Sequence, residues 1–212
     1  NILPISGSRK FNIPIKRALE LWWLGRLTKA CLKKCDYISA ESHSSIKLLR
    51  SLTHRPLHLS LNGMDKEFAV KKYSYKKEIR QDIAVVVGTY FHKDVQHAYR
   101  AFEQLKKRRA DLVLHVFGRT ESIPRQIKNK KDVVFHNDQN HDIILEYLSK
   151  AMYYINTSLI ENSWNASLEG IMLAQTALIS DIPPHRELIS YLKLEKGLLK
   201  KSPNDLIEIR CE

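Results

Sequence analysis

The chain has no run of apolar residues long enough to cross a membrane, for which a helix needs about 18 or more in succession. It also contains no internal repeat and no low-complexity tract. The sequence therefore predicts a protein that does not span a membrane, and it gives no sign of a repeat architecture. Because the chain opens at Asn1 without a methionine, the absence of a signal peptide excludes nothing.

Cysteine is scarce and odd in number, with only Cys31, Cys35 and Cys211. Cys31 and Cys35 lie four positions apart on an expected helix, without a second pair or a nearby histidine cluster. This spacing is poor for a zinc site and does not make a disulfide framework. We interpret the cysteines as reduced thiols in a cytosolic protein, and the two on the helix as small apolar side chains.

Acidic residues are few relative to basic ones. The 23 Asp and Glu residues stand against 35 Lys and Arg, which gives a formal net charge of +12. Such a surplus predicts an anionic partner, namely phosphates, lipid headgroups or nucleic acid. With 212 residues and 43% hydrophobic content, the chain can bury the core of one domain, or of one and a fraction.

The first part of the sequence predicts helices and short strands. Apolar residues recur at helical spacing over residues 15–34, among lysines and arginines. The next expected elements are a strand at 37–41, a helix with serine caps at 42–52 and a strand at 56–61. Asn62-Gly63 is a turn signal, and the charged stretch between Met64 and Asp82 is the best candidate for a linker.

After this linker the sequence alternates regularly between strands and helices. The expected strands lie at 83–88, 112–117, 133–135, 152–158 and 177–181. The expected helices lie at 94–108 and 141–150, and begin near 163, 184 and 202. This alternation predicts an α/β fold, in which a Rossmann-like parallel sheet carries helices on both faces. The expected division is a partial α/β segment at 1–65, a linker at 66–82 and the Rossmann-like domain at 83–212.

The most informative stretch places two carboxylates, Glu161 and Glu169, on either side of a Ser/Asn cluster that is typical of a helix start. An aromatic and β-branched strand precedes the cluster and another strand follows the helix, which makes a βαβ unit. In such a unit, the loop at the carboxyl end of the first strand and the free N–H groups of the helix form an anion site. A ligand with a central diphosphate and hydroxyl-rich groups at both ends suits this geometry, and nucleotide sugars have that shape.

Four segments resemble, in order, the signatures of one family: a junction signature, a phosphate-contacting turn, a two-glutamate motif and a following strand. They are Leu61–Phe68, Val86–Gly88 with Lys93, Glu161–Glu169, and Thr176–Asp181 with Glu187 and Gly197. On these segments the span from Asp36 to Leu206 resembles the carboxyl part of a retaining glycosyltransferase of family 4, which has the two-domain GT-B architecture. The glutamate motif alone is weakly specific, and the resemblance depends on all four segments.

The sequence departs from the family pattern at several positions. Thr89 stands where the family has an arginine, and Lys93 comes one residue early, so phosphate clamping rests on Lys93 alone or on a further basic residue such as His92. Two glycines and a proline of the pattern are replaced by Asn162, Ala174 and Thr176. The chain is also too short for two Rossmann-like domains. It is either a fragment, with residues 1–65 as the end of the acceptor-side domain, or a protein that lacks most of that domain.

The resemblance implies which residues bind the nucleotide sugar. The backbone N–H groups of Ser163, Trp164 and Asn165 would cradle the donor diphosphate at the start of a helix. Gly88 and Thr89 would form the turn that contacts the phosphates.

The resemblance also implies roles for three charged residues. Lys93 would neutralise the charge on the departing nucleotide diphosphate, and Glu161 would contact the donor sugar, so both are expected to be catalytic. Glu169 would accept hydrogen bonds from the ribose hydroxyls. The implied reaction transfers a sugar with retention to a glycan or lipid-linked acceptor in bacterial surface polysaccharide synthesis, without a metal or cofactor. The chain by itself is expected to bind the nucleotide weakly and to transfer nothing.

Other interpretations stay open. The helix at 15–34, with Trp22-Trp23 among basic residues, either presents a core-facing apolar stripe or contacts an anionic membrane surface peripherally. The expected location is accordingly the cytoplasm, with the second alternative placing the protein at the inner face of the membrane. A donor-binding pseudoenzyme and a GT-B sugar-nucleotide epimerase are further alternatives. A nucleic-acid partner is disfavoured because no helix-turn-helix, RNP aromatic pattern or Cys/His finger is visible.

Overall fold

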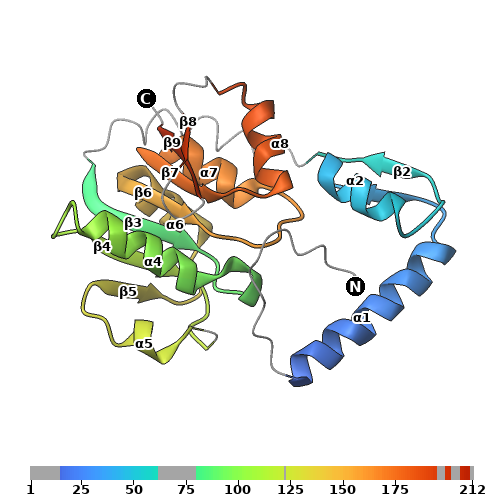
Figure 1. Ribbon diagram of the computed structural model, residues 1–212, viewed down its shortest axis with the longest axis horizontal. Coiled ribbons are helices and arrows are strands. Elements are labelled where there is room, and N and C mark those ends of the chain that lie inside the picture. Colours follow the sequence, from blue (N-terminus) through green and yellow to red (C-terminus); the bar gives the residue numbers. More distant parts are fainter. Residues whose placement is uncertain (1–14, 62–79, 122, 195–198, 202–205, 211–212) are drawn as a thin grey trace. The chain divides into compact units, whose positions relative to one another are not determined.

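The computed structural model describes residues 15–61, 80–121, 123–194, 199–201 and 206–210. The chain divides into two compact units, Asn1–Asn62 and Gly63–Glu212 (Figure 1). Most of the expected linker at 66–82 lies outside the described residues, and its last two residues already belong to a strand. The domain limits expected from the sequence stay a prediction.

The first unit contains two short parallel strands and two helices. Its elements are α1 (Ile15–Lys34), β1 (Ile38–Ala40), α2 (His43–Arg50) and β2 (Leu57–Leu59). The bounds of α1 are those expected from its apolar spacing. Ser42 caps α2 as predicted, because its side chain accepts a hydrogen bond from the Ser45 amide.

Most of the large apolar side chains of α1 are exposed. Trp22 and Trp23 are each 58% exposed, and Leu19 is 61% exposed. Among the described large apolar side chains of α1, only Leu32 is buried. Among the described residues of this unit, most of the apolar side chains of α1 therefore do not face a core, and the choice between the two interpretations of this helix stays a prediction.

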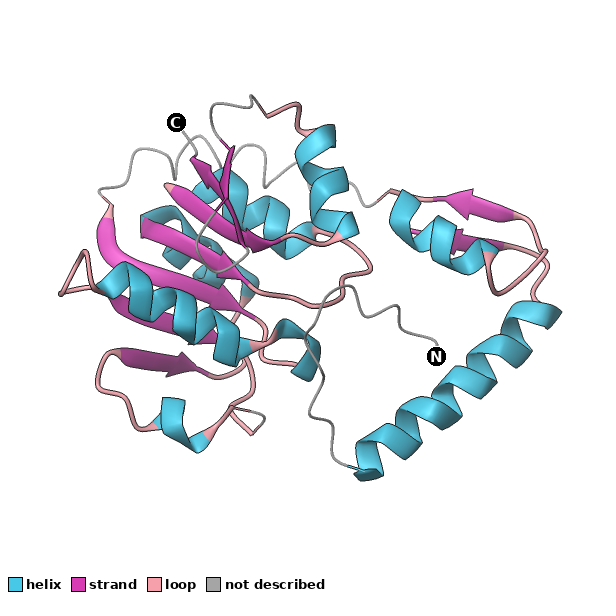
Figure 2. Cartoon of the chain, viewed as in Figure 1, coloured by secondary structure: helices cyan, strands magenta, loops and turns pink. Residues whose placement is uncertain are grey.

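The second unit is built on a seven-stranded sheet with the order β5-β4-β3-β6-β7-β9-β8 (Figure 2). Its strands are β3 (Gln81–Val87), β4 (Val113–Phe117), β5 (Val133–His136), β6 (Ala151–Asn156), β7 (Thr176–Ser180), β8 (Leu199–Lys201) and β9 (Leu206–Arg210). The five strands from β5 to β7 are parallel, whereas β9 is antiparallel to both β7 and β8. The predicted fold class, α/β with a mainly parallel sheet, is confirmed.

Helices cover both faces of this sheet. They are the 3-10 turn η1 (Phe91–Lys93) and the α-helices α4 (Val95–Lys106), α5 (Arg125–Lys128), α6 (His141–Lys150), α7 (Asn165–Leu173) and α8 (Pro183–Tyr191). Alternate residues of β3 point to opposite faces, as in any strand. Val85 belongs to the core formed with α6, α7 and α8, while Ala84 and Val86 belong to the core formed with α4 and α5.

The prediction of a helix from about residue 202 is wrong for the residues that the structure describes. Residues 206–210 form β9, which pairs with β7 so that Leu206 lies opposite Ser180. Leu206 and Ile209 are fully buried on opposite faces of the sheet, and the isoleucines favour an extended backbone. The start of the expected helix, at 202–205, lies outside the described residues. The elements η1, α5 and β8 were not predicted.

The strand order puts a topological switch point between β3 and β6. From β3 the chain moves outward through β4 and β5, and it then returns to the other side of β3 with β6 and β7. The connections that leave the carboxyl ends of β3 and β6 run in opposite directions along the sheet, and a crevice at such a point is where ligands bind in open α/β sheets. The segments that follow β3 and β6, residues 88–94 and 157–165, therefore define the region of interest.

Candidate functional site

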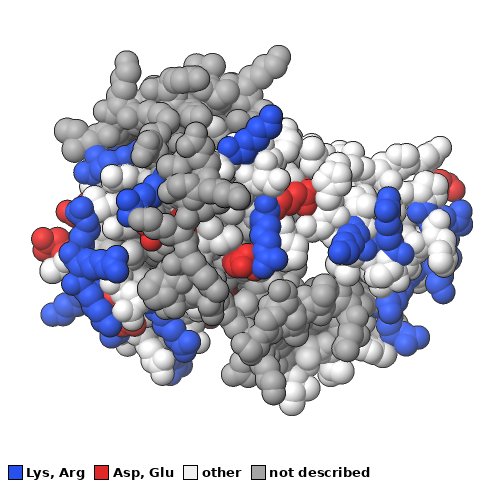
Figure 3. Space-filling model, turned by 45° about the horizontal axis from the view of Figure 1, so that its top comes forward, with Lys and Arg blue, Asp and Glu red and all other residues white. Residues whose placement is uncertain are grey.

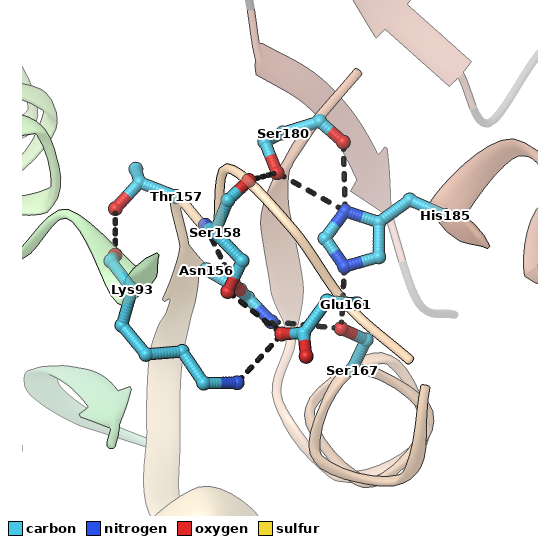
Figure 4. Close-up of polar contacts among 8 residues, drawn as sticks. All are labelled: Lys93, Asn156, Thr157, Ser158, Glu161, Ser167, Ser180 and His185. Carbon is cyan, nitrogen blue, oxygen red and sulfur yellow. Dashed lines mark hydrogen bonds and ion pairs between the residues drawn. The ribbon is translucent and has the colours of Figure 1, made fainter. Parts of the chain in front are cut away.

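An ion pair joins the two segments at the switch point. The Nζ of Lys93, at the end of η1, lies 2.6 Å from Oε1 of Glu161, in the loop after β6 (Figure 4). The two side chains are only 13% and 12% exposed. The two residues that the sequence predicts to be catalytic are thus brought into contact, although they are far apart along the chain.

The turn after β3 positions Lys93 through a glycine. Gly88 has a φ of +89°, and an added Cβ would lie 3.2 Å from the Cε of Lys93, so both its conformation and its neighbour favour glycine. Asp94 then caps α4 by accepting from the His97 amide. The hydroxyl of Thr157 lies within hydrogen-bond distance of the carbonyl oxygens of Lys93 and Asp94, which ties the η1 segment to the end of β6.

Glu161 is held as a carboxylate by its neighbours. Its Oε1 also lies 2.7 Å from the Ser158 hydroxyl and 3.5 Å from Nδ2 of Asn156. Burial alone would raise the pKa of Glu161, but the positive charge of Lys93 and the hydrogen bonds from Lys93 and Ser158 lower it below its ordinary value. The site therefore contains a desolvated anion that is compensated by one cation.

Glu169 lies in different surroundings on the following helix. Its Oε1 is 3.0 Å from Nε2 of His141, the first residue of α6. Burial raises the pKa of Glu169, and His141 offsets only part of this effect. The structure therefore gives the two glutamates of the motif separate partners, and along the chain one glutamate precedes the start of α7 and the other follows it.

The start of α7 lies between the two glutamates. The helix begins at Asn165, with Trp164 at the capping position, and neither a side-chain cap nor an acidic residue occupies its first turn. Trp164 is buried, and its ring lies 6.3 Å from that of Tyr191 on α8. Ser163 precedes the cap and is half-buried. An uncapped helix start of this kind offers free N–H groups and a positive dipole end to an anion.

The hydroxyl of Thr89 is hydrogen-bonded within the protein, and the imidazole of His92 is partly buried. The Thr89 hydroxyl donates to the carbonyl of Arg119 at 2.6 Å, and a Cβ at Gly118 would lie 2.8 Å from this hydroxyl. Burial lowers the pKa of His92, and the neighbouring Lys93 lowers it further, so the imidazole stays neutral near pH 7. Of the two basic residues proposed to clamp phosphate, Lys93 is the one that carries a charge.

Sequence reasoning missed a cluster of buried polar side chains that lies behind Glu161. Its members are Asn156, Ser158, Ser167, Ser180 and His185, which are at most 4% exposed (Figure 4). The unusual number of small polar residues at the end of a buried strand, Asn156-Thr157-Ser158, was a visible signal. No spacing connects them with Ser167 or His185, because those residues come from α7 and α8.

Two absences hold for the part of the chain that the structure describes. No group of three or more His, Cys, Asp or Glu residues there is placed to hold a metal ion. No helix there combines the length and the apolar character that crossing a membrane requires. The expectation that the protein needs no metal or cofactor stays a prediction.

Sequence comparison assigns the family. Residues 45–208 match the sequence model of the glycosyl transferases group 1, and the chain belongs to this family. Among curated proteins, none matches the sequence at a significant level.

Solved structures share the fold at low sequence identity. WaaG, a glycosyltransferase involved in lipopolysaccharide biosynthesis, has a TM-score of 0.56 and 15% identity, over 74% of this chain and 47% of WaaG. The α,α-trehalose 6-phosphate synthase of Burkholderia multivorans has a TM-score of 0.57 and 10% identity, over 85% of this chain and 56% of the synthase.

A third structure, the pneumococcal O-GlcNAc transferase GtfA in complex with UDP and GlcNAc, has a TM-score of 0.52 and 12% identity, over 71% of this chain and 31% of GtfA. At such identities the likeness concerns the fold alone, which is that of GT-B glycosyltransferases. The chain spans about half the length of WaaG and of the synthase, and less of GtfA.

Proposed function

We propose that this chain carries the nucleotide-sugar-binding part of a retaining glycosyltransferase of family 4. The enzyme would transfer a sugar from a nucleotide-diphosphate sugar to a glycan or glycolipid acceptor. The observation that carries the proposal is the buried Lys93–Glu161 ion pair next to the uncapped start of α7. Membership of the glycosyl transferases group 1 family supports it independently.

The charges around the ion pair suit a reaction whose leaving group is a nucleoside diphosphate. Cleavage of the bond between the sugar and the diphosphate leaves additional negative charge on the phosphate oxygens. An oriented cation, Lys93, and the positive end of α7 stabilise that charge where it develops, in a site that excludes much of the water. Glu161 would accept hydrogen bonds from sugar hydroxyls, and its anionic form is favoured by its lowered pKa.

Glu169 would bind the ribose of the donor. It is the fifth residue of α7, about one turn along the helix from the loop that would hold the diphosphate, which separates it from the bond that breaks. Its carboxylate is bound to the imidazole of His141, which is 59% exposed, so ribose hydroxyls would replace or share this contact. Ser163, Trp164 and Asn165 would supply backbone N–H groups to the diphosphate, and Gly88 and Thr89 would lie beside it.

The test is a thermal-shift assay of the 212-residue chain with UDP, GDP, ADP and their glucose conjugates. A ligand that binds the folded state raises the Tm with its concentration. We expect one nucleotide series to raise the Tm of the chain. In Lys93→Ala, at least tenfold more ligand should be needed for the same rise, which corresponds to a loss of about 1.4 kcal/mol of binding free energy. The matched control is Lys106→Ala, because Lys106 forms an ion pair of the same length, 2.6 Å, with Asp132 outside the site.

Binding and activity measurements also distinguish the proposed transferase from a nucleic-acid binder, a pseudoenzyme and an epimerase. Tight RNA or DNA binding with a steep salt dependence, and no response to any nucleotide, would reverse the proposal in favour of a nucleic-acid binder. Donor binding without turnover by the complete enzyme would indicate a pseudoenzyme. Release of an epimerised sugar without an acceptor would indicate an epimerase.

The proposed context is bacterial surface polysaccharide synthesis at the inner face of a membrane. Its support is the fold shared with WaaG, which is described as involved in lipopolysaccharide biosynthesis. Lys and Arg cover clearly more of the described surface in Figure 3 than Asp and Glu do, in keeping with the net charge of +12.

The helix α1 is the proposed membrane contact, because it exposes Trp22 and Trp23 beside Arg26 and Lys29. Co-sedimentation of the chain with vesicles that contain anionic lipid, and loss of binding in Trp22→Ala/Trp23→Ala, is the expected result. Equal binding of that variant and the unmodified chain would contradict the contact.

A further inference from the structure

A buried chain of hydrogen bonds runs behind Glu161, and the proposed function leaves it unexplained. Its members come from the end of β6 and the loop after it, and from α7, β7 and α8: Asn156, Ser158, Ser167, Ser180 and His185 (Figure 4). His185 is fully buried. Enclosing so many polar groups is unfavourable unless each finds a partner, and here every member does.

The contacts of His185 determine which of its ring nitrogens donates a hydrogen bond and which accepts one. Its Nδ1 lies 2.7 Å from the carbonyl oxygen of Ser180, which can only accept, so Nδ1 carries the ring proton. Nε2 is then unprotonated and accepts from the Ser167 hydroxyl at 2.9 Å. Burial lowers the pKa of His185, which keeps the ring neutral and preserves this direction.

The direction set at His185 is transmitted to the Asn156 amide. Since the Ser167 hydroxyl gives its proton to the imidazole, its oxygen accepts from Nδ2 of Asn156 at 2.8 Å. Oδ1 of Asn156 then faces Ser158, whose N–H and hydroxyl lie 2.9 and 2.6 Å away. A reversed amide would place an NH₂ group against the N–H of Ser158 and its oxygen against the oxygen of Ser167, whose proton is on the imidazole side, so the contacts at both ends favour the same orientation.

The amide orientation in turn determines what Glu161 meets. With Oδ1 turned toward Ser158, Nδ2 of Asn156 lies 3.5 Å from Oε1 of Glu161. The Ser158 hydroxyl lies 2.7 Å from the same oxygen. The Ser158 hydroxyl has a single proton, which Oδ1 of Asn156 or Glu161 can accept but not both at once, so the buried chain holds Ser158 through its N–H and its carbonyl. Among the described residues, Asn156 and Ser158 are the groups other than Lys93 that present protons to Glu161, and the buried chain positions both.

The backbone of the loop is braced by the same histidine. The Ser180 hydroxyl donates to the carbonyl of Ser158 at 2.5 Å, and its oxygen lies 3.2 Å from Nδ1 of His185. The strand β7 and the helix α8 thus hold the loop that carries Glu161 from behind.

We propose that Ser167 and His185 are positioning residues for Glu161, which act through Asn156 to hold its carboxylate against Lys93. What Glu161 does there rests on the proposed function, whereas the positioning itself depends only on these hydrogen bonds. The role differs from that of an ordinary buried histidine, because it requires the Nε2 lone pair and not merely the volume of the ring.

The first experiment needs no ligand. Ser167→Ala removes the link between the imidazole and the amide, and Ser149→Ala is its matched control, since Ser149 is equally buried and its hydroxyl donates to the Glu146 carbonyl on α6. The titration of Glu161 is followed by carbon-13 NMR. We expect Ser167→Ala to raise the pKa of Glu161 toward its ordinary value and Ser149→Ala to leave it unchanged. An unchanged Glu161 titration in Ser167→Ala would overturn the proposal.

A second pair of variants separates the two nitrogens of His185. His185→Gln keeps an acceptor within reach of Ser167, whereas His185→Asn keeps a donor within reach of the Ser180 carbonyl. The Glu161 titration should stay close to that of the unmodified chain in His185→Gln and resemble that of Ser167→Ala in His185→Asn. Equal behaviour of the two variants would show that the histidine only fills space. If neither variant folds, the Glu161 titration in Ser167→Ala and in its control Ser149→Ala still tests the positioning role.

The third experiment measures the effect on the sugar. Affinities for UDP-glucose and UDP are compared in the unmodified chain and in Ser167→Ala. We expect the preference for UDP-glucose over UDP to fall about three- to tenfold in Ser167→Ala. An equal loss for both ligands would overturn the positioning role. Absence of binding of either ligand to the unmodified chain would count against the proposed donor, while the Glu161 titration would still decide the inference.

Discussion

The two glutamates of one nine-residue motif lie in opposite electrostatic surroundings. Glu161 meets an ammonium group and a hydroxyl, and its pKa is lowered. Glu169 meets an imidazole, and burial raises its pKa. The difference indicates that spacing in the sequence places the two carboxylates, whereas their surroundings set the direction of each pKa shift. Lys93 and Ser158 outweigh burial at Glu161, and burial outweighs His141 at Glu169. Identical side chains in one motif can thus have pKa values that are shifted in opposite directions.

The largest effect should follow from removing the cation of the first pair. Lys93→Met leaves the Glu161 carboxylate buried without a counter-charge, which should cost about 3 kcal/mol of the free energy of unfolding. Urea denaturation measures it. Adding Glu161→Gln to Lys93→Met should recover most of the loss. The matched variant Lys106→Met, at the more exposed Lys106–Asp132 pair, should cost less than about 1 kcal/mol. Equal losses for the two lysines would contradict the special character of the Lys93 pair.

The next effect separates the two glutamates by ligand. Glu169→Ala should weaken donor binding about ten- to a hundredfold, because one or two hydrogen bonds from ribose to a charged acceptor are lost. In the complete enzyme this appears as a higher KM, while Glu161→Ala should chiefly lower kcat. Steady-state kinetics distinguish these outcomes. Unchanged donor affinity in Glu169→Ala would show that the assignment of roles is wrong.

The opposite pKa shifts predict opposite dependences of stability on pH. The folded-state pKa of Glu161 is lowered, so its contribution is present above the ordinary value of 4.5 and is lost as the pH falls below it. The folded-state pKa of Glu169 is raised, so its contribution is present below 4.5 and is lost as the pH rises above it. Relative to the unmodified chain, Glu161→Gln should therefore be least stable near neutral pH, and Glu169→Gln should be relatively most stable there. The free energy of unfolding of each variant is measured by urea denaturation across this pH range. The same pH dependence in both variants would contradict the opposite pKa shifts of Glu161 and Glu169.

The smallest effect should come from a buried hydroxyl near the first glutamate. The hydroxyl of Tyr154 makes no hydrogen bond with any described residue. Burial, and then the charge of Glu161, raise the pKa of Tyr154, while the proximity of Asn156 and Ser167 opposes this only partly. Tyr154→Phe removes the unsatisfied group and should change the free energy of unfolding by less than about 1 kcal/mol, in the stabilising direction. A clear destabilisation would indicate that the hydroxyl has a partner in solution.

Much of the fold followed from local patterns. The helix α1 was predicted with its observed bounds, because its apolar spacing is regular and long. The buried strands of the parallel sheet were predicted because they are continuous apolar runs between helices. The error at β9 has a physical reason: its strand character depends on hydrogen bonds with β7, which are non-local and invisible in the sequence.

The candidate site could be predicted in part. Glu161 and Lys93 were identified from motifs, but their direct contact depends on the neighbouring positions of β3 and β6 in the sheet. Ser167 lies between the two glutamates of the motif but is not one of the residues on which the resemblance depends, and His185 is not among the residues matched in any of the four segments. Their pairing is a consequence of how α7 and α8 pack, and a buried serine and histidine on separate helices are indistinguishable from ordinary core residues until the packing is known.

The contact between α7 and β6 has a consequence for how the site meets a ligand. A Cβ on Gly170 would lie 2.1 Å from the ring of Tyr154, so the helix rests directly on an aromatic ring of the sheet, with no side chain of its own between them. Sliding or rotating α7 would drive its backbone into that ring. Glu169 and the helix start are therefore preorganised during folding, and a ligand that binds there meets a rigid surface instead of ordering a flexible one.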